Sequence, residues 1–215
     1  MYIKSIIKGF LYKSFKKFYN WIIYIIERRN FIKKTSNIKK IKIVIGASNT
    51  EYKNWISTNS NLLDVTNILS FKKILKYETV DNFLAEHVFE HLTETQGKLA
   101  TDNCYKFLKI SGVLRIAVPD GFFPSKEYIN SVKPGGYGQG AYDHKILYNY
   151  MTIRNIFDEK KFTLNFIEYF DENEKFNEKT LTKENGYIIR SRYNDTRNYN
   201  NLIKYTSLIV DAVKI

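Results

Sequence analysis

Three short, predominantly apolar runs, each followed by small or polar residues, limit most strongly what this chain can fold into. They are Ile41–Ile45, Val80–Ala85 and Val113–Val118. Runs of this length and composition predict strands buried on both faces of a parallel sheet. A helical periodicity over about residues 93–108 lies between the second and third runs. This alternation of strands and helices predicts an α/β fold with an open sheet.

Weaker patterns extend this prediction along the rest of the chain. A weaker strand is predicted at Trp55–Asn59, and two late strands at Leu164–Phe170 and Tyr205–Val213. A helix is predicted over His144–Lys160, after the glycine-rich loop Lys133–Gly140. With 215 residues, of which 44% are hydrophobic, the chain can bury one sizeable core and is too short for two full-sized domains.

The basic charge of the chain is concentrated at its beginning. The formal net charge is +12, and residues 1–40 carry nine Lys and two Arg against the single acid Glu27. Residues 41–215 are therefore nearly neutral, which argues against a body that binds nucleic acid. The sequence thus predicts a basic arm over residues 1–40, a folded domain over residues 41–215, and no nucleic-acid partner.

The arm has the pattern of a basic amphipathic helix. The longest apolar stretch in it, Trp21–Ile26, is far too short to span a membrane. Such a helix can lie on an anionic membrane surface, or it can pack on its own domain or on a second subunit. Its apolar residues recur at spacings of three and four: Ile3, Ile6, Ile7, Phe10, Leu11, Phe15, Phe18, Ile22, Ile25 and Ile26.

Two further features bear on location. The single cysteine, Cys104, rules out an internal disulfide framework and suits a reducing compartment. No small-residue cleavage site follows the apolar stretch of the arm, so no signal peptide is expected. We expect a cytoplasmic protein, with peripheral contact to the inner face of the membrane through residues 1–40 if the arm binds lipid.

Small and polar residues gather just past the ends of the predicted strands. In an open α/β sheet the ligand crevice lies outside the carboxyl ends of the strands, so residues there are candidates for binding or catalysis. They are Gly46, Ala47, Ser48, Asn59, Glu86, His87 and Asp120.

The segment from His87 to His91 matches the H-x-x-E-H pattern of one class of zinc metallopeptidases, with Glu90 as the general base. That site needs a third protein ligand and lies within a long helix, whereas this motif starts directly at a strand end. We therefore expect no metal here. His91 is expected to be an ordinary helix-face residue.

Other candidates allow a functional and a structural interpretation. Asp64 and Asp120 can contact a ribose or adenine, or can cap the turns that follow them. Arg190 and Arg192, with Arg197, can clamp an anionic group or form a solvated basic loop. His144, preceded by Tyr142 and Asp143, can act as a general base on a lid or can be satisfied by its neighbours.

Several segments together resemble a family of predicted S-adenosylmethionine-dependent methyltransferases with a class I, Rossmann-like fold. The resemblance covers about residues 41–214, and its most specific parts are AEHVFEH and LRIAVPDG. The other matching segments are KIVIGASNTEYKNWISTN, LLDVTN, YDHKILYNYMTI and YTSLIVDAVK. The resemblance implies a mostly parallel sheet, helices on both faces and a late antiparallel strand.

The resemblance also implies roles for individual residues. Gly46, Ala47 and Ser48 would form the loop under the methionine part of the cofactor S-adenosyl-L-methionine. Asn59 would lie at the ribose and Asp64 near the adenine. The residues where the methyl group meets its acceptor would be Ala85, Glu86 and His87. Independently of the resemblance, His144 after the glycine-rich loop is a further catalytic candidate. Substrate-binding candidates are Asp120, Tyr142, Asp143, Arg190 and Arg192.

This sequence departs from the family pattern at the cofactor loop, which reads GASNT, and at Asn59, where a carboxylate is usual. Family members tend to occur in sugar or surface-glycan gene sets. The function expected from the resemblance is therefore methyl transfer to a small-molecule or glycan acceptor, through a hydroxyl, in polysaccharide biosynthesis. The alternative is a non-catalytic, membrane-associated module that keeps the fold.

Overall fold

The computed structural model describes residues 2–47, 51–200 and 202–215, with side chains described from Phe15 onward. The chain forms two compact units, residues 1–39 and residues 40–215. The first unit consists of helix α1 (Tyr2–Ser36), as the sequence pattern predicts. No helix among the described residues combines the length and apolarity that crossing a bilayer requires.

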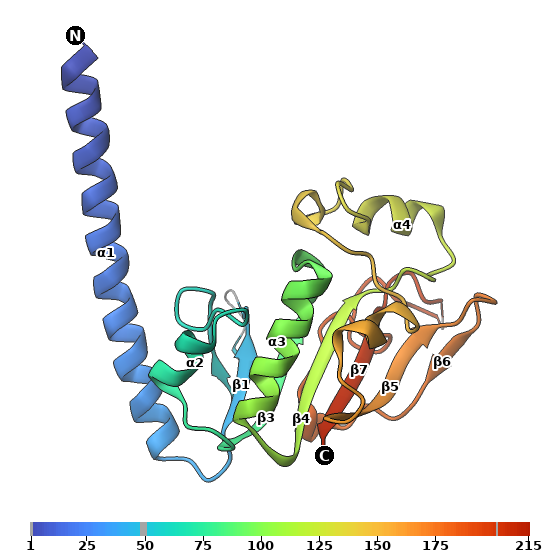
Figure 1. Cartoon of the computed structure of the whole chain (residues 1–215). Helices are drawn as coiled ribbons and strands as arrows, with labels where there is room; N and C mark the ends of the chain where they lie inside the picture. The colour runs from blue at the N-terminus through green and yellow to red at the C-terminus, as the bar shows by residue number, and fades with distance from the viewer. Residues whose placement is uncertain (1, 48–50, 201) are drawn as a thin grey trace. The chain divides into compact units, whose positions relative to one another are not determined.

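The second unit is built on one mixed sheet of seven strands in the order β2-β1-β3-β4-β7-β5-β6 (Figure 1). Strands β1, β2, β3 and β4 pair in parallel, and β7 pairs antiparallel with both β4 and β5. The strands are β1 (Lys42–Ile45), β2 (Ile56–Ser57), β3 (Val80–Glu86), β4 (Leu108–Pro119), β5 (Phe162–Phe170), β6 (Phe176–Glu178) and β7 (Ser207–Lys214). This arrangement confirms the predicted α/β fold with a late antiparallel strand.

Helices α2 (Ile68–Ile74) and α3 (Glu94–Phe107) pack on one side of the sheet. Phe71 of α2 stacks on Phe107 of α3, with ring centroids 5.0 Å apart, and meets Phe83 of β3 edge-on at 6.0 Å. A capping box formed by Thr93 and Gln96 begins α3 where the sequence predicts its start. These contacts bury the apolar side of β3.

The opposite side of β3 and β4 is covered by the segment that leads from β6 to β7, which includes the 3-10 turn η4 (Lys183–Asn185). Ile188 of this segment is fully buried against Leu84 and Ala117. Arg115 of β4, also fully buried, donates to the carbonyl oxygens of Thr182 and Gly186. A long connection rather than an α-helix therefore closes this part of the core.

The helix predicted over His144–Lys160 is wrong. The side chain of Asn149 accepts hydrogen bonds from the backbone N–H groups of Met151 and Thr152, which competes with helical pairing. Only the 3-10 turn η3 (Thr152–Ile156) forms within this range. His144 instead has extended backbone at the end of the 3-10 turn η2 (Ala141–Asp143).

The helices α2 and α4 (Lys126–Val132) are absent from the sequence-based prediction. Each has seven residues, too few to establish a helical period. Asn67 and Ser125 cap their first turns through side-chain oxygens. Tertiary packing and these caps, rather than periodicity, define both helices.

Candidate functional site

A cleft of about 490 Å³ lies at the carboxyl ends of β1 and β3, within the size range of small-molecule sites. Gly46 and Ala47 line it from the end of β1, and Glu86 and His87 from the end of β3. The remaining lining residues are Val44, Ile45, Tyr52, Leu84, His91, Gln139, His144, Ile189, Arg190, Asn194, Asp195, Thr196 and Arg197.

Gly46 forms the turn at the base of this cleft. Its φ of +63° is a left-handed conformation that glycine adopts without strain. A Cβ atom at this position would lie 2.8 Å from Cγ2 of Val88, closer than van der Waals contact allows. Backbone geometry and space therefore both require glycine here, which keeps the cleft open beside the end of β1.

Glu86 fastens the loop that forms the far wall of the cleft. Its two carboxylate oxygens accept the backbone N–H groups of Ile189, at 3.1 Å, and of Arg190, at 2.8 Å. The Arg190 guanidinium also lies 3.9 Å from the same carboxylate. Glu86 therefore acts as a positioning residue that ties the end of β3 to a loop about a hundred positions later in the chain.

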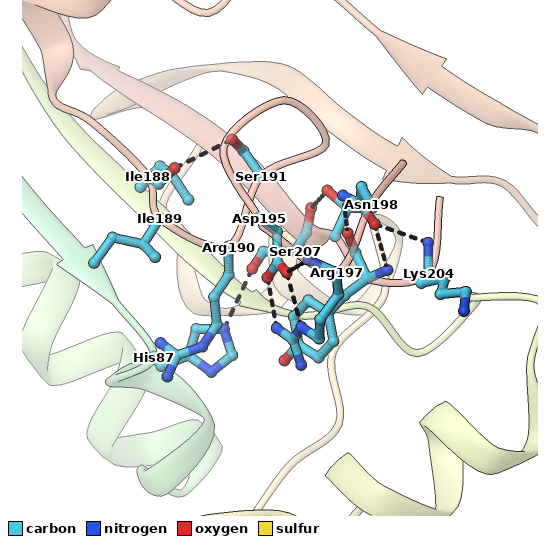
Figure 2. A network of polar contacts seen from close by, with 12 residues as sticks. His87, Ile188, Ile189, Arg190, Ser191, Asp195, Arg197, Asn198, Lys204 and Ser207 are labelled. Carbon is cyan, nitrogen blue, oxygen red and sulfur yellow. Dashed lines mark hydrogen bonds and ion pairs between the residues drawn. The ribbon is translucent and has the colours of Figure 1, made fainter. Parts of the chain in front are cut away.

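His87 projects into the cleft from a left-handed backbone conformation, with φ of +54°. Its Nδ1 lies 3.0 Å from Oε1 of the buried Glu90. Its Nε2 lies 3.3 Å from Oγ of Ser207, and Figure 2 shows these two residues. A strained conformation of this kind persists only where the surroundings enforce it, and such residues cluster at active sites. His87 therefore presents an imidazole ring to the cleft from a backbone conformation that its surroundings hold in place.

The loop over the cleft is held by its own polar network (Figure 2). Asp195 accepts two hydrogen bonds from the Arg197 guanidinium, which lies 3.5 Å from the centroid of the Tyr205 ring. Asn198 donates to the carbonyl oxygens of Arg192 and Tyr205. These contacts give the cleft a fixed wall of carboxylate, guanidinium and amide groups.

Tyr52 contributes an unsatisfied polar group. Its hydroxyl is buried and has no hydrogen-bond partner among the described residues, although the side chain lines the cleft. Burial raises the pKa of this phenol, with the Glu86 charge adding to the effect, so the hydroxyl stays neutral and can donate a hydrogen bond. A buried donor without a partner costs stability, and a polar ligand in the cleft would satisfy it.

The structure brings together part of the set predicted from sequence. Gly46, Ala47, Glu86, His87, His144 and Arg190 all line the cleft. Ala85 is fully buried in β3 directly before it. Ser48 lies outside the described residues.

The other candidates lie elsewhere. Asn59 accepts the backbone N–H of Leu62, and Asp64 accepts that of Thr66, so both cap turns away from the cleft lining. Tyr142 is exposed, and Arg192 pairs with Glu178. Asp143 pairs with Lys145 and lies 3.5 Å from His91.

Asp120 is fully buried and accepts the backbone N–H groups of Phe122 and Phe170. Burial raises its pKa to about 6 from the ordinary 3.8. The folded state therefore holds a proton that the unfolded state has released between these values, so the Asp120 contribution to stability falls as pH rises from about 4 to about 7.

We expect the stability difference between wild type and the variant Asp120→Asn to change by about 3 kcal/mol over that pH range. Urea unfolding at a series of pH values measures it. Parallel pH profiles for the two proteins would contradict the assignment. Asp158→Asn, which removes an exposed carboxylate whose pKa is lowered chiefly by a backbone hydrogen bond from Lys160, is the control.

Sequence reasoning missed Tyr52, Asn194, Asp195 and Thr196 as lining residues, and it treated His91 as a helix-face residue. The strand-end rule finds only residues next to strands, and these residues enter the cleft from loops. Polar loop residues such as those in the segment YNDTRN resemble solvated loops in sequence. For Asn194, Asp195 and Thr196 the missing information is the fold of the connection between β6 and β7.

No protein-family model matches the sequence, and no curated protein matches it significantly. Among solved structures, the chain is similar to a SAM-dependent methyltransferase from Archaeoglobus fulgidus, with 16% identity, a TM-score of 0.45, and coverage of 91% of this chain and 93% of that chain. It is also similar to a SAM-dependent methyltransferase from Thermotoga maritima, with 10% identity, a TM-score of 0.42, and coverage of 94% and 95%.

A third similar structure is the phosphoethanolamine N-methyltransferase 2 of Haemonchus contortus in complex with S-adenosylhomocysteine. Its identity is 12%, its TM-score 0.38, and the match covers 66% of this chain and 38% of that chain. Because these TM-scores are low, the fold assignment rests on the strand order and strand pairing of this chain itself.

Proposed function

We propose that this chain is an S-adenosyl-L-methionine-dependent methyltransferase. The observation that carries the proposal is the cleft at the carboxyl ends of β1 and β3, in a sheet whose antiparallel β7 lies between β4 and β5. The Gly46 turn, Glu86 and His87 meet in this cleft. They come from the same segments that carry the class I methyltransferase resemblance.

The described residues fit the methionine end of this cofactor. The Gly46 turn leaves space beside β1, and the unpartnered Tyr52 hydroxyl can donate to a polar group of a ligand. The Arg190 guanidinium, partly exposed at the cleft, can pair with a carboxylate. Asn59, expected at the ribose, accepts the backbone N–H of Leu62 through Oδ1 and does not line the cleft as described.

The bound cofactor supplies a methyl group activated by a positively charged sulfur. An acceptor hydroxyl that took this methyl group would have to lose its proton to the protein. We assign that proton to Nε2 of His87, whose Nδ1 faces Glu90. Most of the rate enhancement in such a displacement comes from alignment and exclusion of water, which the anchored loop Ile189–Arg190 provides.

The acceptor we propose is a hydroxyl of a glycan or of another small molecule. The cleft wall offers Gln139, Asn194, Asp195 and Thr196. Amide, carboxylate and hydroxyl groups of this kind form hydrogen bonds with sugar hydroxyls. The nearly neutral domain and the small volume of the cleft favour such an acceptor over a nucleic acid.

Cofactor binding is the first test of this function. S-adenosylhomocysteine should stabilise the full chain by about 2.7 kcal/mol at a hundred times its dissociation constant, measured by thermal unfolding. Homocysteine alone, which lacks the adenosine, should produce no comparable shift and is the ligand control. Equal unfolding temperatures with and without S-adenosylhomocysteine at millimolar concentration would overturn the proposal.

We also propose that α1 holds the enzyme at an anionic membrane surface. Phe15, Phe18 and Trp21 of this helix are more than half exposed, and Lys16 and Lys17 lie among them and are exposed. Exposed aromatic side chains next to lysines are typical of helices that lie in the interface of anionic bilayers. The peripheral membrane contact expected from the sequence would follow from this binding.

The full chain should float with phosphatidylglycerol vesicles and stay in solution with phosphatidylcholine vesicles. The double variant Lys16→Gln, Lys17→Gln should bind anionic vesicles about 30-fold more weakly, at about 1 kcal/mol for each lysine. The control is Lys126→Gln, Lys160→Gln, which removes two exposed lysines from the other unit. Binding that is equal for both vesicle types and all three proteins would contradict the proposal.

A further inference from the structure

All three histidines of the chain gather around one buried carboxylate, that of Glu90. Glu90 is 1% exposed, and neither of its carboxylate oxygens has an aligned hydrogen bond with any described residue. Nδ1 of His87 lies 3.0 Å from Oε1. A buried carboxylate with unfilled acceptor sites requires a cationic or donor partner.

His144 faces Glu90 with a lone pair. Its Nδ1 lies 2.6 Å from the carbonyl oxygen of Val132, which can only accept, so the proton of the neutral ring is on Nδ1. Its Nε2 is therefore an acceptor, and it lies 4.0 Å from Oε1 of Glu90. A metal ion placed between these two buried acceptors would satisfy both of them.

His91 supplies a third donor atom on the same side. Its ring lies edge-on to that of His144, with centroids 4.8 Å apart, and its Nδ1 faces the Asp143 carboxylate at 3.5 Å. A proton on Nδ1 directed at Asp143 leaves Nε2 of His91 free to bind a metal. Metal-binding histidines are commonly oriented in this way, by a carboxylate or a carbonyl oxygen at the other ring nitrogen.

We propose that Glu90, His91 and His144 bind one divalent transition-metal ion such as Zn²⁺. One candidate ligand atom from each lies within 4.8 Å of the others, and bonds of about 2.0–2.1 Å require them to close by roughly 1 Å. Imidazole and carboxylate ligands suit zinc and iron, and three protein ligands leave a position open.

The ion would be open to the cleft, because His91 and His144 both line it. The HVFEH motif thus contributes ligands, but not the His87–His91 pair that the metallopeptidase pattern requires. His87 and His91 do not share the face of an α-helix. The backbone of His87 has a left-handed conformation, and residues Phe89–His91 form the short 3-10 turn η1. The sequence predicts no metal at this motif. The proposed site has three ligands, of which only Glu90 and His91 belong to the motif.

Co²⁺ titration of the full chain without a histidine tag tests this site through its visible absorption. We expect one Co²⁺ per chain, displaced by Zn²⁺. Because loss of a residue that merely orients a ligand already costs about 10–100-fold, Glu90→Gln and His144→Ala should each weaken binding at least about 100-fold. Glu94→Gln, which removes an exposed carboxylate four positions away, should bind as wild type does.

His91→Ala keeps the test independent of folding, because His91 is partly exposed and its loss should leave the unfolding temperature nearly unchanged while Co²⁺ binding weakens. Failure of the wild-type chain to bind Co²⁺ or Zn²⁺ would overturn the proposal. Binding by Glu90→Gln equal to wild type would also overturn it. Neither result depends on S-adenosylhomocysteine, so the metal site and the methyltransferase function fail separately.

Discussion

Replacing Arg115 with methionine should destabilise the chain by about 3–5 kcal/mol, because it leaves the Asp211 carboxylate buried without its cationic partner. Arg115 is fully buried and donates to both Asp211 oxygens, from Nε at 2.6 Å and from Nη2 at 2.7 Å. Urea unfolding measures the loss. Because Arg115 also holds the carbonyl oxygens of Thr182 and Gly186, the segment beneath the cleft wall should loosen as well.

The double variant Arg115→Met, Asp211→Leu separates the ion pair from the packing. Removing both charges should recover much of the stability lost in Arg115→Met, since no unpaired charge then remains in the core. Lys98→Met, which breaks the exposed pair with Glu94, is the matched control and should cost no more than about 0.5 kcal/mol. Equal losses for Arg115→Met and Lys98→Met would contradict a buried, paired Arg115.

Replacing Glu86 with alanine should release the far wall of the cleft. The change removes the acceptor of the Ile189 and Arg190 backbone N–H groups, each an unusually strong bond to a charged group. We expect a loss of about 2–4 kcal/mol in the local stability of this loop, seen as faster hydrogen exchange at these two amides. S-adenosylhomocysteine binding should weaken with it.

Glu86→Gln should lie between wild type and Glu86→Ala, because its amide keeps one carbonyl oxygen as an acceptor. Glu184→Gln changes an exposed acid in the same connection and should leave exchange at Ile189 and Arg190 unchanged. Unaltered exchange in Glu86→Ala would show that Glu86 does not anchor the loop. Loss of ligand binding with unaltered exchange would instead assign Glu86 to the ligand directly.

The sequence predicts the strands of this fold well because their signal is local. The runs before Gly46 and Glu86 are short, apolar and bounded by small or polar residues, and both form strands that end at the cleft. The helix predicted from His144 to Lys160 does not form, because the Asn149 side chain accepts the backbone N–H groups of Met151 and Thr152. The spacing of apolar residues does not reveal this contact.

The sequence predicts mainly the site residues that lie at the carboxyl ends of β1 and β3. Its other half depends on contacts between residues about a hundred positions apart, such as Glu86 with Arg190. The buried Arg115 likewise gives no local signal, since an arginine inside an apolar strand has no partner until β7 brings Asp211 beside it. Asn59 and Asp64, which the sequence singles out as cofactor-binding candidates, each accept a backbone N–H group of a turn in the structure.

The proposal that the cleft binds S-adenosyl-L-methionine is tested most directly by calorimetric titration of the full chain with S-adenosylhomocysteine, the product form of the cofactor. We expect saturable heat with one site per chain. Gly46→Val should weaken that binding strongly, because a β-branched side chain at a positive φ and in contact with Val88 would distort the base of the cleft. No heat of binding to the wild-type chain at millimolar ligand would contradict the proposal.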